Sequence, residues 1–529
     1  MINNLNEYDN KTQIKGQICI IGAGTVGLFL ANELANRGIN TIVIEAGDTT
    51  IRTPKEKNYE CIHKGIKYSG SEDGRAFGIG GTSALWGGQM IPLVKSDLQD
   101  RSYIGYDKWP IKYKELEKYF EKTANILGLG GYEGKSDYKK LLDSRFSVLQ
   151  KCKSDFDLRL SQWLPFEMRN MSKAFSKNIE NNSNIQIYLN AMAYKLEKND
   201  QNSITKIIAK NNNNIEIEFI PEQTIISLGA LESTRLLLEF DEQNDYIITK
   251  EGSPLGKFFA DHLSVNCGKF QCKNWNKFNM LFSPIFEKGI MRTPRLELKS
   301  NIQKEEGLSS AFAHFSFVTN GDTGFDLVRS ILRKNQGKNN QINLSLNNIF
   351  KSIKDITSLI WWRYIKQRLW IPRKAELSLQ VDIEQIANEE SRLSLDNTLD
   401  KYGRKKLIIN WKIQDKDFEI IRKVTKKVEE FWLNTKLDDV ATLKLNSLDN
   451  LESFNTPYDV YHPTGTIRMG NNIKNSVVDA DLKIWNLNNC YVNSTAVFPS
   501  PGSANPGMVS YALTLKLADH LHTKIKESR

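Results

Sequence analysis

The sequence contains little histidine and little cysteine, with six of each among 529 residues. No group of His, Cys and carboxylate residues has the spacing of a metal site, and no two cysteines form a C-x-x-C pair. The sequence therefore predicts no metal ligand set, and its cysteine usage favours a reducing compartment. The cysteines are Cys19, Cys61, Cys152, Cys267, Cys272 and Cys490.

Long apolar runs are also missing. No stretch of 18 apolar residues occurs, so we expect no membrane-spanning helix. Residues 1–16 are polar and lack the apolar core of a secretory signal. These two absences predict a cytoplasmic protein. Hydrophobic residues make up 40% of the chain and aromatic residues 10%, which is enough for a large core.

The first pattern that is present lies near the N-terminus. An apolar run over residues 17–21 is typical of a buried parallel strand, and a glycine-rich turn follows at 22–27. Residues 28–35 have helical apolar spacing, and Gly38 lies where a helix C-cap belongs. A second strand at 41–44 then ends in Glu45. This order of elements predicts a β-α-β unit that binds a dinucleotide.

Each glycine of that turn, and the glutamate after the second strand, has a physical role. Gly22 permits the tight turn, Gly24 lets the backbone approach a pyrophosphate, and Gly27 lets helix and strand pack closely. The N-terminus of the helix faces the phosphates. Glu45 can accept hydrogen bonds from ribose hydroxyls and would repel the 2′-phosphate of NADP. The pattern does not decide between NAD and FAD, and a glycine-rich turn before a core helix remains the simpler alternative.

A second glycine cluster follows at residues 74–88, where six of 15 residues are glycine. Such a segment forms neither a regular helix nor a regular strand, and it suits backbone wrapped around a large flat ligand. A mobile surface loop is the alternative interpretation. Phe77, Leu85 and Trp86 argue against it, because free surface loops rarely carry so many large apolar side chains.

With these residues the chain resembles the glucose-methanol-choline (GMC) family of FAD-dependent alcohol oxidoreductases, and within it most resembles the pyranose oxidase and sugar dehydrogenase branch. Five segments carry the resemblance, in the family's order and over almost the whole chain: 22–45, 80–111, 224–238, 391–403 and 462–517.

The resemblance implies FAD-dependent oxidation of an alcohol. His462 matches the family's catalytic histidine, which takes the hydroxyl proton while a hydride passes to flavin N5. Asn505 matches its partner, which orients the substrate oxygen, and Pro506 fits the first turn of a helix that follows. The dipole of that helix would favour a reduced anionic flavin. A satisfied core histidine and a helix cap are the respective structural alternatives.

Two positions depart from relatives of this family. Relatives with covalently attached flavin have a histidine before the residue that matches Trp86, whereas this chain has Leu85, so we expect non-covalent FAD. Ser494 stands where many relatives have Asp, which weakens the argument for a cofactor contact at this position.

The motifs and the resemblance together assign the cofactor contacts to 23 positions. They are Gly22, Gly24, Thr25, Val26, Gly27, Glu45, Ala46, Arg75, Gly80, Gly81, Thr82, Ser83, Leu85, Trp86, Gly87, Gly88, Ala193, Ser227, Gly229, Ser494, Asn505, Pro506 and Met508. Substrate contacts are assigned to His314, Asp382 and Gln385, and we interpret His262 as a structural hydrogen-bonding residue.

The expected fold is an α/β Rossmann-type FAD-binding domain with an α+β substrate domain built on a six-stranded antiparallel sheet. The FAD-binding domain is expected to be discontinuous, formed by 1–110, 180–262 and 445–529. Residues 111–179 would form a connecting helical segment or lid, and 263–444 the substrate domain. The six strand candidates are 263–271, 290–298, 310–318, 376–385, 392–395 and 407–411.

Most of the formal charge of +10 lies in one insertion of the substrate domain. Residues 326–374 contain eleven Lys and Arg against Asp326 and Asp355, a net charge of +9, together with Trp361, Trp362 and Trp370. Three interpretations stay open: a helical cover with a solvated charged face, peripheral docking at the inner membrane surface, or a surface for a protein partner. No motif for nucleic-acid binding accompanies the charge.

The sequence thus predicts an FAD-dependent dehydrogenase or oxidase that acts on a CH–OH group of a small molecule, with a sugar or glycoside as the expected substrate. Two alternatives are a non-redox lyase on the same scaffold and a membrane-associated flavoprotein adaptor. The electron acceptor, whether oxygen, a quinone or a protein, stays open.

Overall fold

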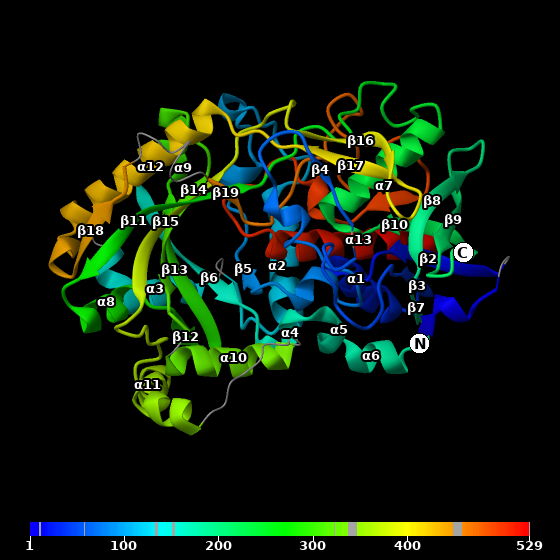
Figure 1. Cartoon of the computed structure of the whole chain (residues 1–529). Helices are drawn as coiled ribbons and strands as arrows, with labels where there is room; N and C mark the ends of the chain where they lie inside the picture. The colour runs from blue at the N-terminus through cyan, green and yellow to red at the C-terminus, as the bar shows by residue number, and fades with distance from the viewer. Residues whose placement is uncertain are drawn as a thin grey trace.

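The computed structural model describes residues 1–9, 12–57, 59–132, 136–150, 154–321, 323–336, 346–447 and 457–527. Two large sheets lie side by side in separate lobes, and both chain termini lie in the lobe on the right of Figure 1. Residues 337–345 of the basic insertion, and short parts of the expected domains, lie outside the described residues.

The right-hand lobe is built on a sheet of eight strands. Six of them, in the order β1-β7-β3-β2-β10-β20, pair in parallel, and β9 and β8 extend β10 in antiparallel fashion. The bounds are β1 (Ile2–Asn4), β7 (Ile185–Leu189), β3 (Thr41–Ile44), β2 (Gln13–Ile21), β10 (Glu216–Ile226), β20 (Cys490–Val492), β9 (Ile204–Lys210) and β8 (Met192–Lys198).

The predicted β-α-β unit is present at the centre of this sheet. Strand β2 ends in four apolar residues, 18–21, that are fully or almost fully buried, as a central parallel strand requires. Helix α1 (Thr25–Ala35) follows, and Gly38 has a φ of 77°, which suits a helix end. Strand β3 then pairs in parallel with β2, so local apolar periodicity was enough to predict these elements.

The C-terminal helix α13 (Gly507–Glu527) packs beside α1 and α2 (Tyr113–Ile126), and it crosses the middle of the molecule in Figure 1. Most of its side chains are buried, including Met508, Ala512 and Leu515. Because both ends of the chain share this core, the C-terminal segment is positioned against the N-terminal β-α-β unit. Helix α7 (Gly229–Gln243) follows β10 in the same lobe.

The left-hand lobe is built on a nine-stranded, wholly antiparallel sheet. Its main path is β18-β11-β15-β14-β13-β6-β5, with β12 beside β13 and β19 beside β11. The bounds are β18 (Ala441–Leu445), β11 (His262–Cys272), β15 (Glu376–Glu384), β14 (Ala311–Val318), β13 (Ile290–Leu298), β6 (Phe156–Trp163), β5 (Gln89–Met90), β12 (Ile285–Glu287) and β19 (Tyr458–Asp459).

The expected six-stranded composition of this sheet is therefore not what the structure has. Four of the predicted strands are in it, but β16 (Arg392–Leu399) and β17 (Lys405–Asn410) form a separate three-stranded sheet with β4 (Ile62–His63). Strand β6 comes from the segment expected to be helical, and it pairs with β13 over seven residues. Which sheet a strand joins depends on partner strands that are far away in the sequence. The apolar alternation within one segment gives no information about those partners.

Helices cover the outer face and the lower edge of this lobe. Helix α12 (Asp415–Asn434) packs on β15 and β14, and α10 (Gly324–Gln336) with α11 (Leu346–Tyr364) lies at the lower left of Figure 1. No described helix is long and apolar enough to cross a membrane. The remaining helices are α3 (Ser136–Gln150), α4 (Phe166–Arg169), α5 (Met171–Ala174), α6 (Ser176–Asn181), α8 (Trp275–Phe282) and α9 (Ser300–Glu306).

Candidate functional site

A cavity of about 810 Å³ lies where the two lobes meet. One part is lined by the turn after β2, the end of β3 and the second glycine cluster. The other part is lined by the inner face of the antiparallel sheet. His462, Asn505 and the start of α13 lie on the same cavity, so segments far apart in the sequence build one site.

The three glycines of the first turn have different surroundings. Gly22 has a φ of 107°, and a Cβ there would lie 2.6 Å from the carbonyl oxygen of Ser227. A Cβ on Gly27 would lie 2.0 Å from the carbonyl oxygen of Gly22. A Cβ on Gly24 would meet no atom within 4 Å and would point into open space on the cavity. Gly22 and Gly27 are thus required by packing, and Gly24 leaves room for a ligand.

The N-terminus of α1 is open toward the cavity. Gly24 is its N-cap and supplies no side-chain hydrogen bond, and Thr25 and Val26 line the cavity. The first-turn N–H groups and the helix dipole suit an anionic group such as a pyrophosphate. The second glycine cluster closes on this turn: a Cβ on Gly81 would lie 2.8 Å from Gly24 Cα, and the Thr25 and Thr82 hydroxyl oxygens are 3.3 Å apart.

Glu45 lies at the end of β3 and lines the cavity. Its Oε2 accepts a hydrogen bond from the N–H of Ala23 at 2.9 Å, and its Oε1 accepts from the N–H of Gly47 at 2.8 Å and of Gly78 at 3.0 Å. Burial raises the pKa of Glu45, and these three N–H groups oppose that shift. The carboxylate therefore joins both glycine segments and keeps lone pairs for ribose hydroxyls.

Three hydroxyl or amide oxygens on the cavity wall are buried and have no hydrogen-bond partner within the described part of the chain. They are the Oγ of Ser227, the Oγ of Ser510 and the Oδ1 of Asn505. Buried polar atoms are almost always paired in folded proteins, so three unpaired atoms on one cavity indicate a polar ligand. Together with the glycine cradle and the open helix N-terminus, they fit FAD.

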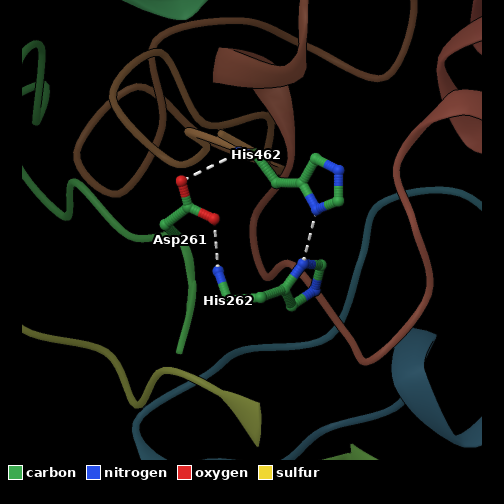
Figure 2. A group of neighbouring side chains, drawn as sticks. All are labelled: Asp261, His262 and His462. Atoms are coloured by element: carbon green, nitrogen blue, oxygen red, sulfur yellow. Dashed lines mark hydrogen bonds between the residues drawn. The ribbon is translucent and has the colours of Figure 1, made fainter. Parts of the chain in front are cut away.

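His462 and His262 form a pair on the cavity wall. Their Nδ1 atoms are 3.0 Å apart and their rings are nearly perpendicular, at 89° (Figure 2). His262 Nε2 lies 2.7 Å from the carbonyl oxygen of Gly502. Burial, and then the proximity of His262, lower the pKa of His462 well below its usual range, so its imidazole is neutral at pH 7.

Asp261 holds the backbone of this pair in place. Its carboxylate accepts hydrogen bonds from the N–H of His262 at 2.6 Å and the N–H of His462 at 2.8 Å (Figure 2). It also accepts one from the hydroxyl of Tyr68 at 2.7 Å. Burial raises the pKa of Asp261 to about 8. One potential ligand atom from each of Asp261, His262 and His462 lies within 4.8 Å of the others, as in a metal site. Hydrogen bonds within the protein already engage these groups, so the cluster is explained without a metal ion.

The far wall of the cavity is a polar face of the antiparallel sheet. Side chains that alternate along β14 and β15 face it, and His314 and Gln380 are register partners, as are Phe312 and Asp382. The Nε2 of His314 lies 3.0 Å from Asp382 Oδ2, and Gln380 donates to Ser264 Oγ at 3.0 Å. Besides His262 and Trp163, the polar lining residues on this face are Gln89, Ser161, Ser264, Thr293, Arg295, His314, Ser316, Gln380, Asp382 and Tyr458.

Most of the residues assigned from the sequence line this cavity. His462, Asn505, His314 and Asp382 do so, together with Gly22, Gly24, Thr25, Val26, Glu45, Ala46, Arg75, Gly81, Thr82, Leu85, Trp86, Gly87, Gly88, Ala193, Ser227, Gly229, Ser494 and Pro506.

Five assigned residues do not line it. Gln385 is buried elsewhere, where its side chain contacts Lys412 and Trp411. Ser83 donates to the Gly80 carbonyl, Met508 is in the core, and Gly80 and Gly27 pack against protein atoms.

The sequence did not single out Ser264, Gln380, Arg295 or Tyr458, which line the substrate wall. Strand alternation could have found Gln380, since it lies two residues before Asp382 on β15.

Comparison with known proteins agrees with this architecture. Residues 15–61 match the model of an FAD-binding domain, and residues 387–514 match the model of GMC oxidoreductases. The chain therefore carries a GMC oxidoreductase C-terminal domain and an FAD-binding domain. The GMC match contains both His462 and Asn505, and the FAD-binding match contains the first glycine turn and Glu45. This protein is therefore an FAD-dependent oxidoreductase.

Solved structures of two oxidases share its fold. Formate oxidase from Aspergillus oryzae RIB40, solved as the R554A variant, is 16% identical with a TM-score of 0.59; the match covers 98% of this chain and 100% of that one. Pyridoxine 4-oxidase from Mesorbium loti is 16% identical with a TM-score of 0.61; the match covers 96% and 99%. No curated protein sequence matches this chain. The likeness at this identity concerns the fold alone.

Proposed function

We propose that this GMC oxidoreductase oxidises a CH–OH group of a polyhydroxylated small molecule, of the sugar or glycoside class, with His462 as the base. The observation that carries the proposal is the placement of His462. It lines the cavity with its Nδ1 bonded to His262, and its other ring nitrogen points away from that partner (Figure 2). A neutral imidazole in this position can take a proton from a substrate hydroxyl.

Asn505 is suited to orient that hydroxyl. Its Oδ1 is buried on the cavity wall without a partner in the described residues, and it lies just before α13. An amide cannot act as a base, but it can fix the substrate oxygen by hydrogen bonding. FAD, when bound, supplies the hydride acceptor. The dipole at the start of α13 favours negative charge at this end of the cavity.

The polar sheet face supports the substrate class. The wall opposite the glycine turn offers hydroxyl, amide, carboxylate and imidazole groups, among them Ser264, Gln380 and Asp382. His314 pairs with Asp382 and Gln380 pairs with Ser264 within this wall. These groups keep further donor and acceptor sites, which a substrate with one hydroxyl on a hydrocarbon would leave unused. A substrate with several hydroxyls would pair with them. We further propose that FAD is held without a covalent bond, since Leu85 on the cavity offers no atom for attachment.

The test is anaerobic mixing of the yellow holoenzyme with a panel of alcohols, followed by flavin absorbance. We expect sugars or other polyols to bleach the flavin, and monohydric alcohols of similar size to bleach it at least tenfold more slowly. Selective bleaching by apolar alcohols would contradict the substrate class. Product formation with the flavin still oxidised would show the non-redox lyase instead.

We also propose that helix α11 docks on an anionic membrane surface. Ile353, Ile360, Trp361 and Tyr364 recur at helical spacing along one stripe, and each is between 46% and 68% exposed. Exposed basic residues lie within or shortly after this helix in the sequence: Lys354, Lys366, Arg373 and Lys374. An exposed apolar stripe with basic residues close in the sequence fits a surface of anionic lipid, where each nearby cation contributes about 1 kcal/mol.

Co-sedimentation with vesicles that contain anionic lipid tests this docking. We expect binding at low salt that weakens as salt is added, and a loss of at least tenfold in the triple variant Ile360→Ser, Trp361→Ser, Tyr364→Ser. Leu433→Ser is the matched control, since Leu433 is equally exposed on α12. Failure of the wild-type protein to bind anionic vesicles at low salt would overturn the proposal, and so would equal loss in the control.

A further inference from the structure

We infer that His262 is a positioning residue that fixes the tautomer of His462, so that the basic lone pair of His462 is on Nε2. This inference rests on the proposed role of His462 as the base. A chain of two hydrogen bonds in series supports it: one joins the Gly502 carbonyl to His262, and the other joins His262 to His462.

The direction of each hydrogen bond follows from the first one. A carbonyl oxygen only accepts, so His262 Nε2 must carry the proton that it shares with Gly502 at 2.7 Å. Burial lowers the pKa of His262, so its ring is neutral and its Nδ1 is an acceptor. The facing Nδ1 of His462, 3.0 Å away, must then be the donor. In neutral His462 this leaves Nε2 unprotonated.

Gly502 is itself firmly placed, so its carbonyl is a fixed reference for the chain. Its N–H donates to Glu384 Oε1 at 2.8 Å, and the same oxygen accepts from Arg101 Nη2 at 2.8 Å. Gly502 has a φ of 61°, and a Cβ there would lie 2.4 Å from Leu93. Both Arg101 and Glu384 are almost fully buried. Gly502 is therefore held by a buried ion pair through its N–H and by contact with Leu93.

The same chain helps His462 after it has taken a proton. The imidazolium then holds protons on both nitrogens, and its Nδ1–H still donates to the lone pair of His262. His262 thus takes the place that a carboxylate occupies in a Ser-His-Asp triad, but without a charge. A neutral acceptor orients the base and leaves the pKa of His462 low, whereas a buried carboxylate would raise it.

The direct test is the tautomer of His462 in the holoenzyme. Two-bond ¹H–¹⁵N spectra of protein labelled at histidine are simple here, because the chain has only six histidines. The His462 signals are assigned by their loss in His462→Gln. We expect a proton on Nδ1 and a bare Nε2. A proton on Nε2 in the wild-type holoenzyme would overturn the inference.

Two substitutions test the consequence. His262→Asn keeps an acceptor oxygen near the position of Nδ1, and His262→Leu removes it. We expect the flavin reduction rate at saturating substrate to fall by about 100-fold in the Leu variant and by less than tenfold in the Asn variant, with little change in KM. We also expect mixed tautomers of His462 in the Leu variant. His522→Gln, on the distal part of α13, controls for loss of a histidine.

Retained flavin absorbance shows that a variant is folded. If His262→Leu loses FAD, the inference is still tested by the tautomer of His462 in the wild-type protein and by the flavin reduction rate of His262→Asn. Unchanged reduction rates in a folded Leu variant would contradict the positioning role. Normal reduction in His462→Ala would instead contradict the proposed function, and the tautomer measurement separates these two failures.

Discussion

Two glycines of the first turn serve different purposes: one is required by packing within the protein, and the other leaves room for the cofactor. A Cβ on Gly27 would meet the Gly22 carbonyl at 2.0 Å, whereas a Cβ on Gly24 would meet no protein atom within 4 Å. The sequence motif treats both positions alike. The structure shows that one serves packing between helix and strand, and that the other opens on the cavity.

Gly27→Ala and Gly24→Ala should therefore fail in different ways. We expect Gly27→Ala to lower the unfolding free energy of the apoprotein by about 1–3 kcal/mol or more through overpacking. Gly24→Ala should leave apoprotein stability within about 0.5 kcal/mol but weaken FAD binding by at least about tenfold, because the methyl group enters the cofactor space. Denaturation of the apoproteins and flavin titration measure the two effects. Tight FAD binding by Gly24→Ala would contradict the placement of the cofactor.

The low pKa of His462 predicts an unusual pH profile. A base works only when it is unprotonated, so the flavin reduction rate rises with pH through the pKa of the base. Burial and His262 move that pKa well below 6.5, so the acid limb should lie below pH 6.5. Burial raises the pKa of Asp261 to about 8, so the titration of Asp261 lies above pH 6.5 and can be distinguished from that of His462. Stopped-flow reduction between pH 5 and 8 checks this, and a half-maximal rate above pH 6.5 would contradict it.

The motifs and the family resemblance together named most of the predicted residues that line the cavity, and the residues that they missed have a physical reason. His462, Asn505 and the glycines were found because they sit in local motifs. His262 was interpreted as a hydrogen-bonding residue, but its pairing with His462 was not predicted, because His462 is 200 positions away and only the fold brings the two Nδ1 atoms to 3.0 Å. Gln385 was assigned to the substrate wall, yet its side chain turns to the backbone of Lys412. Its direction depends on where β15 ends, which the sequence does not mark sharply.

At the scale of elements, helix α12 shows how one buried face holds the substrate lobe together. Trp432 is 1% exposed, stacks on Phe282 at 5.2 Å between ring centroids and donates its indole N–H to the Ala441 carbonyl at 2.8 Å. Leu433, the next residue, is 59% exposed. Helix α12 therefore has a large buried side chain and an exposed one at adjacent positions, and these can be substituted as a matched pair.

Trp432→Ala should lower the unfolding free energy by about 3–5 kcal/mol, since it leaves a cavity and removes a buried hydrogen bond. Leu433→Ala is the control and should change it by no more than about 0.5 kcal/mol. Chemical denaturation monitored by circular dichroism measures both. Equal effects of the two substitutions would mean that α12 does not pack on the sheet as described.

Where periodicity is strong, the elements β2, α1 and β3 were predicted, and the bounds of β3 agree with the prediction. Strand β2 begins at Gln13 and helix α1 at Thr25, a few residues before the predicted 17 and 28. Membership of the sheets was predicted less well. Strands β16 and β17 have the expected apolar alternation, but β16 pairs with β17, and β17 pairs with β4, more than 300 residues earlier in the chain. The two-residue strand β5 and β6 complete the substrate sheet from outside the expected substrate domain. Long-range pairing cannot be derived from local pattern.

At the scale of the whole molecule, the cavity takes its walls from both lobes, so the cofactor should tie them together. FAD that binds only the folded protein adds about 2.7 kcal/mol at a free concentration of 100 times its Kd. We expect the apoprotein to unfold at a lower temperature, and FAD to restore the midpoint. Riboflavin, which lacks the phosphates that the α1 N-terminus would hold, should restore less. An unchanged midpoint with FAD would contradict a cavity shared by both lobes.

The central claim is that an imidazole from the C-terminal half of the chain works on a substrate beside a flavin held by the N-terminal glycines. The most direct test is anaerobic stopped-flow measurement of flavin reduction in His462→Ala, with a substrate that bleaches the wild-type enzyme. We predict a variant that keeps its yellow FAD and its KM within a few-fold, but reduces the flavin about 10²–10⁴ times more slowly, with partial rescue by added imidazole. Reduction at the wild-type rate in that variant would contradict the account.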